Sequence, residues 1–148
     1  MKRSKRLQAV VDLAERKSEQ GLQAVAYMQK RIAEEEDKLG QLQACRDEYR
    51  FSVTGSKTSF NAYSLKSYAD FTGNLELAMR QQAGQIEAVK GQLMQVKAHW
   101  QQLDAKHKNL VKTQVKIAAQ EQKIEALAEQ KQQDEYVIQA FSRARADN

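Results

Sequence analysis

The 148-residue chain has no proline and only six glycines. A β-rich or α/β fold needs frequent tight turns, and turns depend heavily on these two residue types. The sequence therefore excludes such folds and predicts an all-α protein built from long helices.

Long apolar runs and cysteine pairs are also missing. The longest apolar run extends only from Ala24 to Met28, whereas a membrane-spanning helix needs about 20 apolar residues. The basic N-terminus is followed by Asp12 and Glu15, which interrupt any signal-peptide core. We expect no membrane insertion. The single cysteine, Cys45, cannot form an intramolecular disulfide, which is typical of a reducing cytoplasm.

The sequence also lacks the residue groupings that carry chemistry. His99 and His107 have no acidic or thiol ligands grouped with them, so we expect no metal. No nucleophile has a base and an orienting group beside it, and two paired helices offer no closed pocket. We therefore expect no enzymatic activity and no cofactor.

The net charge of +5 favours acidic partners. One stretch is particularly basic, because only Asp104 balances five lysines, namely Lys97, Lys106, Lys108, Lys112 and Lys116. Such a stretch is usually a solvated helix face, so we expect no nucleic acid partner.

Apolar residues recur at alternating steps of three and four, the pattern of helices that wind around one another. The first series runs through Leu7, Val11, Ala14, Ser18, Gly21, Val25, Met28, Ile32, Glu35, Leu39, Leu42, Arg46, Tyr49 and Val53. The second runs through Leu65, Tyr68, Thr72, Leu75, Met79, Gln82, Ile86, Val89, Leu93, Val96, Trp100, Leu103, His107, Leu110, Gln114, Ile117, Glu121 and Ile124. We call these positions the seam.

The only cluster of helix-breaking residues separates the two series. We expect helix one over about 4–53, a turn over about 54–61 and helix two over about 62–145, all within a single domain 1–148. Gly73-Asn74 is a rival break, but the seam passes through it in phase. A short connection makes neighbouring helices antiparallel. The sequence predicts an antiparallel coiled-coil hairpin whose second helix is longer and overhanging.

A turn centred near residue 57 fixes which residues face each other. Leu7 then lies opposite about Leu110, and helix two has no intramolecular partner over about 111–145. The same register places Glu35 near Arg80 and Arg46 near Asp70. The apolar side chains kept on the unpaired end indicate a partner that buries them.

Several motifs resemble the FliJ family of the bacterial flagellar type III export apparatus. The basic start leads into Leu7-Gln8-Ala9-Val10-Val11-Asp12-Leu13-Ala14-Glu15. Further matches follow in order: Leu39-x-x-Leu42 leading to Glu48-Tyr49-Arg50, Tyr68-x-x-Phe71-x-x-x-Leu75-x-x-Ala78-Met79-x-x-Gln82, and Trp100 in helix two. The resemblance covers nearly the whole chain.

This resemblance implies a non-catalytic stalk on the cytoplasmic face of the inner membrane at the flagellar base. Its implied partners are the export ATPase hexamer with its regulator, the membrane export gate and export chaperones. By resemblance, the gate-binding patch comprises Leu42, Tyr49, Phe71, Leu75 and Ala78. Of these, Phe71 lies beside the seam and is the better candidate for an exposed anchor, whereas Leu42, Tyr49 and Leu75 are equally explained by packing.

The unpaired end would enter the ATPase ring, and its candidate contact residues are Lys112, Val115, Lys116, Ile124, Leu127, Ile138 and Phe141. Three alternatives stay open. They are the stalk of an injectisome, a basic scaffold that binds nucleic acid or an anionic membrane, and a homodimer that pairs between chains.

Overall fold

The computed structural model describes residues 2–54 and 62–147 and consists of two helices. The first, α1, spans Arg3–Thr54 (52 residues), and the second, α2, spans Ala62–Ala146 (85 residues). Within the described residues there is no strand, which confirms the all-α prediction. The predicted turn lies mainly in residues 55–61, outside the described part of the chain.

Both helices are continuous because nothing inside them stops a helix. Neither contains proline, and no residue of the described chain has a positive φ angle. The possible break at Gly73-Asn74 does not occur, since α2 passes straight through it. Neither helix, as far as the structure describes it, has a segment both long and apolar enough to span a membrane.

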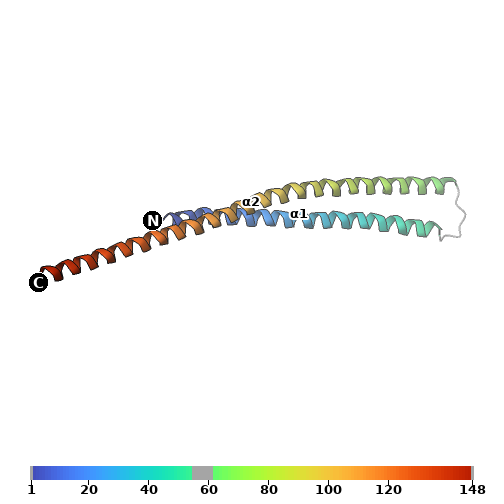
Figure 1. Cartoon of the computed structure of the whole chain (residues 1–148). Coiled ribbons are helices and arrows are strands. Elements are labelled where there is room, and N and C mark those ends of the chain that lie inside the picture. The colour runs from blue at the N-terminus through green and yellow to red at the C-terminus, as the bar shows by residue number, and fades with distance from the viewer. Residues whose placement is uncertain (1, 55–61, 148) are drawn as a thin grey trace. The chain divides into compact units, whose positions relative to one another are not determined.

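The chain divides into two compact units, each made from a part of both helices. Unit 1 comprises Met1–Ser18 with Gln102–Asn148, and unit 2 comprises Glu19–Gln101. Within each unit the helices are antiparallel, because residue numbers fall along α2 as they rise along α1. Ser4 meets Glu121 and Ser18 meets Asp104 in unit 1. The colours of Figure 1, which run from blue at the N-terminus to red at the C-terminus, show the opposite directions of α1 and α2. The fold is an antiparallel two-helix hairpin, as predicted.

The seam predicted from the sequence is the core of both units. Every predicted seam position of α1 is buried or partly buried, and so is every position of α2 except Leu65 and Ile124. Unit 2 holds the most apolar part, formed by Val25, Met28, Met79, Ile86 and Val89. Val89 is only 1% exposed.

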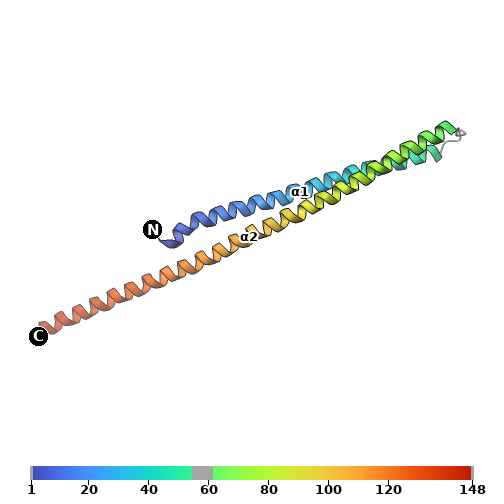
Figure 2. The ribbon, with the colours of Figure 1, turned by 90° about the horizontal axis from the view of Figure 1, so that it is seen from above.

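The pairing register in unit 1 differs from the predicted one. Ser4 bonds to Glu121, and Lys2 forms an ion pair with Glu125. The first turn of α1 therefore reaches farther along α2 than expected, and the unpaired end begins after Glu125 rather than near residue 111. The prediction assumed a connection centred on residue 57 and did not include these polar contacts. We call residues 126–146 the overhang, and both views of the ribbon show it continuing past the N-terminus of α1 (Figures 1 and 2).

The two charge proximities predicted in unit 2 do not lead to ion pairs among the described residues. Glu35 does not pair with Arg80; the side-chain amide of Gln82 donates instead to its carboxylate and, at 2.9 Å, to its backbone carbonyl. Arg46 forms an ion pair with Asp47 of its own helix, at 3.2 Å, rather than with Asp70. A shift of a few residues in register is enough to exchange such partners.

Candidate partner-binding surfaces

Three aromatic rings meet across the helix pair in unit 2. The ring centroid of Tyr49, on α1, lies 5.5 Å from that of Tyr68 and 4.3 Å from that of Phe71, both on α2. Tyr49 and Tyr68 are stacked with an interplanar angle of 13°, whereas Phe71 is tilted by 55°. Tyr68 and Phe71 are three residues apart on one helix face, so both reach the same opposing ring. We call these three residues the aromatic cluster.

The predicted gate-binding residues lie on and around this cluster. Tyr49 and Phe71 are brought into contact, and Phe71 keeps 39% of its surface exposed. Leu42, Leu75 and Ala78 are partly buried. Phe71 therefore presents one side to Tyr49 and leaves the rest exposed. It is the most accessible member of the five.

A shallow hollow lies on the neighbouring surface of unit 2. Its lining combines apolar side chains with both signs of charge and consists of Leu39, Gln43, Arg46, Glu76, Met79, Arg80 and Ala83. The spacing of apolar residues in the sequence did not predict this hollow. It forms where side chains that flank the seam on the two helices meet.

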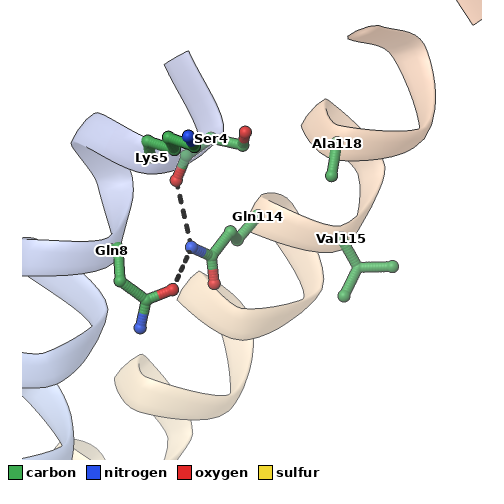
Figure 3. A pocket seen from close by; sticks show the side chains of 6 residues that line it. All are labelled: Ser4, Lys5, Gln8, Gln114, Val115 and Ala118. Carbon is green, nitrogen blue, oxygen red and sulfur yellow. Dashed lines mark hydrogen bonds between the residues drawn. The ribbon is translucent and has the colours of Figure 1, made fainter. Parts of the chain in front are cut away.

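A second feature is a set of hydrogen bonds in unit 1, which we call the polar clasp (Ser4, Gln8, Gln114 and Glu121). The side-chain amide of Gln114 donates to the carbonyl oxygen of Ser4 at 3.0 Å and to Oε1 of Gln8 at 2.7 Å (Figure 3). The hydroxyl of Ser4 donates to Glu121 at 2.6 Å, and its backbone N–H donates to the same carboxylate at 3.1 Å.

The clasp caps the N-terminus of α1 with a carboxylate from the other helix. The first N–H groups of a helix lack internal partners and carry partial positive charge, so an anion there is favourable. The hydroxyl and N–H of Ser4 hold the pKa of Glu121 below its ordinary value. Beside it, the hydrogen bond to Glu125, 2.5 Å long, raises the pKa of Lys2. In the sequence, Gln114 and Glu121 read only as polar interruptions of the seam.

The predicted ring-binding residues are all exposed, but they divide between two settings. Lys112, Val115 and Lys116 lie alongside the first turns of α1, so their prediction as part of the overhang is wrong. Val115 lines a hollow beside the polar clasp (Figure 3). Ile124 stands at the boundary, and Leu127, Ile138 and Phe141 belong to the overhang itself.

The apolar side chains of the overhang have no covering partner within the described chain. Leu127 is 61% exposed, Ile138 64% and Phe141 68%, and Ile124 just before them is 67% exposed. Tyr136 and Val137 are similarly exposed. A helix with so many large apolar side chains in water is typical of a segment that another chain covers.

Neither a metal-binding cluster nor a cysteine pair forms a further site among the described residues. The described residues contain no cluster of three or more His, Cys, Asp or Glu side chains that could hold a metal ion. Cys45 is an exposed free thiol. The features that could serve a function are thus surfaces on a helix pair: the aromatic cluster, the polar clasp and the overhang.

The chain also matches a known protein family. A family model described as flagellar FliJ protein matches residues 3–146. The match covers both helices almost from end to end. Comparison with curated proteins and with solved structures finds no match.

Proposed function

The chain belongs to the FliJ family, a group of flagellar export proteins, and from that premise we propose that it is a non-catalytic stalk in the export apparatus. In this proposal the overhang binds inside the ring of the export ATPase and stimulates it. The surface around Phe71 contacts the export gate at the cytoplasmic face of the inner membrane. Export chaperones and the regulator of the ATPase are further partners.

The family match across residues 3–146 is the observation that carries this proposal. The overhang supports it, because it combines exposed apolar side chains with basic ones. Lys131, Arg143 and Arg145 are exposed there, as are Lys116 and Lys123 on the preceding turns. Basic groups would suit a channel with an acidic lining.

Co-purification with the flagellar export ATPase is the direct test. We expect the full chain to bind the ATPase, to promote ring formation seen by electron microscopy and to raise the rate of ATP hydrolysis. Replacing Ile138 and Phe141 together with Asp should abolish all three effects, because the charged side chains would have to be desolvated at the interface.

A matched control carries the same two charges on exposed residues of unit 2, Tyr27→Asp with Met94→Asp (65% and 74% exposed). It should bind the ATPase like the unchanged chain. Equal binding by all three proteins would contradict the assignment of the overhang, and absence of any binding to the ATPase would contradict the stalk proposal.

The gate surface has its own experiment. Phe71→Ala removes a part-exposed ring and should weaken capture of the soluble part of the gate protein by about tenfold or more, the size of a typical aromatic anchor. Circular dichroism should show unchanged helicity. Tyr27→Ala removes an exposed ring elsewhere in unit 2 and serves as the control. Unchanged capture by Phe71→Ala would show that this site assignment is wrong.

A further inference from the structure

Six exposed residues at the end of α2 form a stripe of their own. Starting at Ile124 and stepping alternately by three and four, the stripe contains Ile124, Leu127, Lys131, Asp134, Ile138 and Phe141. These steps keep all six on one face of a helix that supercoils with another. The continued seam would run through Ala128, Lys131, Glu135 and Ile138. The stripe therefore shares Ile124, Lys131 and Ile138 with it, whereas Leu127, Asp134 and Phe141 lie to one side. The stripe thus continues, farther along α2, the surface that α1 covers, shifted to one side around the helix.

The order of residues along the stripe is self-complementary. Two apolar residues stand at each end, and a base and an acid stand in the middle. If a second copy is laid antiparallel along the stripe, Ile124 meets Phe141 of the second copy, and Leu127 meets Ile138 of the second copy. Lys131 then meets Asp134 of the second copy. The two-fold axis passes between Gln132 and Gln133, so each contact occurs twice, as an isologous interface requires.

The opposite orientation does not fit. In a parallel pair each residue meets its own equivalent, which brings two lysines together at 131 and two aspartates at 134. Like charges held together in a seam repel. In the described chain neither Lys131 nor Asp134 forms an ion pair, so both are available to a partner.

We propose that two copies of this chain associate through this stripe as an antiparallel coiled coil, with paired Lys131–Asp134 contacts setting the register. Apolar contacts at both ends supply the attraction, and the central charges select the antiparallel alignment. The interface is only about three heptads long, so the dimer forms reversibly and depends on concentration.

The dimer has a consequence that rests on the proposed function. It covers Ile124, Leu127, Ile138 and Phe141, the same apolar side chains that we assign to the ATPase ring. Dimer formation and ring binding are then mutually exclusive, and the dimer is a resting form that hides the apolar stripe until the ATPase is present. The dimer itself does not depend on that function.

Sedimentation velocity over a range of concentrations tests the dimer with the full chain, in a Cys45→Ser background that prevents disulfide formation between copies. The unchanged sequence should show a monomer–dimer equilibrium. Lys131→Asp alone brings acid against acid at both symmetric contacts, and Asp134→Lys alone brings base against base. Each should weaken the dimer about tenfold or more, because two charge pairs are lost and replaced by repulsion.

Two combinations should restore the dimer. The double exchange Lys131→Asp with Asp134→Lys reverses each ion pair and returns the dissociation constant to near its original value. An equimolar mixture of the two single variants should also dimerise, because every contact across a mixed pair joins opposite charges. A parallel dimer would instead be weak in the unchanged chain and in the double exchange, and strong only in the mixture.

Matched controls place the same charge changes off the stripe, at the exposed residues Glu129 (Glu129→Lys) and Lys97 (Lys97→Asp). They should leave the dissociation constant unchanged, and helicity should be equal in all variants. A chain that stays monomeric at high concentration overturns the proposal. So does a dimer that the two single variants do not weaken, or that the controls weaken equally. Binding of the monomeric variants to the ATPase is measured separately, so failure of the dimer and failure of the stalk proposal can be told apart.

Discussion

The two units hold their helices together in different ways. Unit 2 uses buried apolar side chains, with Val89 and Ile86 of α2 and Val25 of α1 among the least exposed in the described chain. Unit 1 also buries apolar residues, at Val11 and Ala14. Toward the N-terminus of α1, however, the seam becomes polar, and the hydrogen bonds of the clasp hold the two helices together there.

This difference indicates where the hairpin opens first. Apolar burial contributes stability in proportion to the area removed from water. Hydrogen bonds on a partly exposed surface compete with water and contribute much less. We therefore expect unit 2 to determine global stability, while the first turns of α1 in unit 1 separate from α2 at lower cost and under local control.

The largest expected effect is a charge placed in the core of unit 2. Val89→Asp puts an unpaired carboxylate at a position that is 1% exposed and should destabilise the protein by roughly 3–4 kcal/mol. Thermal unfolding followed by circular dichroism measures the effect. Met94→Asp, at a 74% exposed position of the same helix, should change the midpoint little. Similar losses from both variants would show that Val89 is not part of a stability-determining core.

A smaller effect of opposite sign is expected at the exposed glycines of unit 2. A Cβ added at Gly84 or Gly91 meets no atom within 4 Å, and alanine loses less backbone entropy than glycine in a helix. Gly84→Ala should raise stability by about 0.5–1 kcal/mol. The reverse change at the exposed neighbour, Ala83→Gly, should lower it by a similar amount. No gain from Gly84→Ala would mean that the helical order of α2 around residue 84 does not contribute to the stability of the protein.

Much of the fold follows from hydrophobic spacing. The alternating steps of three and four identified the buried face of both helices, and the absence of proline indicated that each helix is continuous. Ile124 is the exception at the far end of the seam, because it lies at the level where α1 begins and only Lys2 reaches past it. Spacing identifies a face, but it does not say how long the opposing helix covers that face.

The polar contacts could not be predicted in the same way. Gln114 and Glu121 looked like interruptions of an apolar seam. Their partners depend on the pairing register, and the register predicted from the sequence was wrong by a few residues. At the candidate gate surface, the position of Phe71 beside the seam was predictable. Its contact with Tyr49 required the helices to be placed side by side, because one ring comes from each helix.

The next effect is local and concerns the polar clasp. Ser4→Ala removes the hydroxyl that donates a hydrogen bond to Glu121, and Glu121→Gln removes the negative charge at the N-terminus of α1. Both should increase hydrogen exchange of the amides in residues 5–11 and leave residues 25–32 of unit 2 unchanged. Glu129→Gln, on the exposed overhang, is the matched control and should have no effect. Equal exchange in residues 5–11 of all these proteins would show that the clasp does not hold the end of α1.

Acid should open the same end without a mutation. The pKa of Glu121 is lowered in the folded state by the hydrogen bonds from Ser4, so the clasp is fully stabilising above the ordinary pKa of glutamate. Its contribution is lost as the pH falls through the depressed folded-state pKa.

Hydrogen-exchange protection factors, each relative to the intrinsic rate at that pH, measure this opening. Protection of residues 5–11 should fall in acid, and Glu121→Gln should remove that dependence. Glu35 of unit 2 also has a lowered pKa, because Gln82 donates to it, but it lies among apolar seam residues. Protection around Glu35 should therefore fall less. If both regions lose protection in parallel, the polar and the apolar ends of the seam do not open independently.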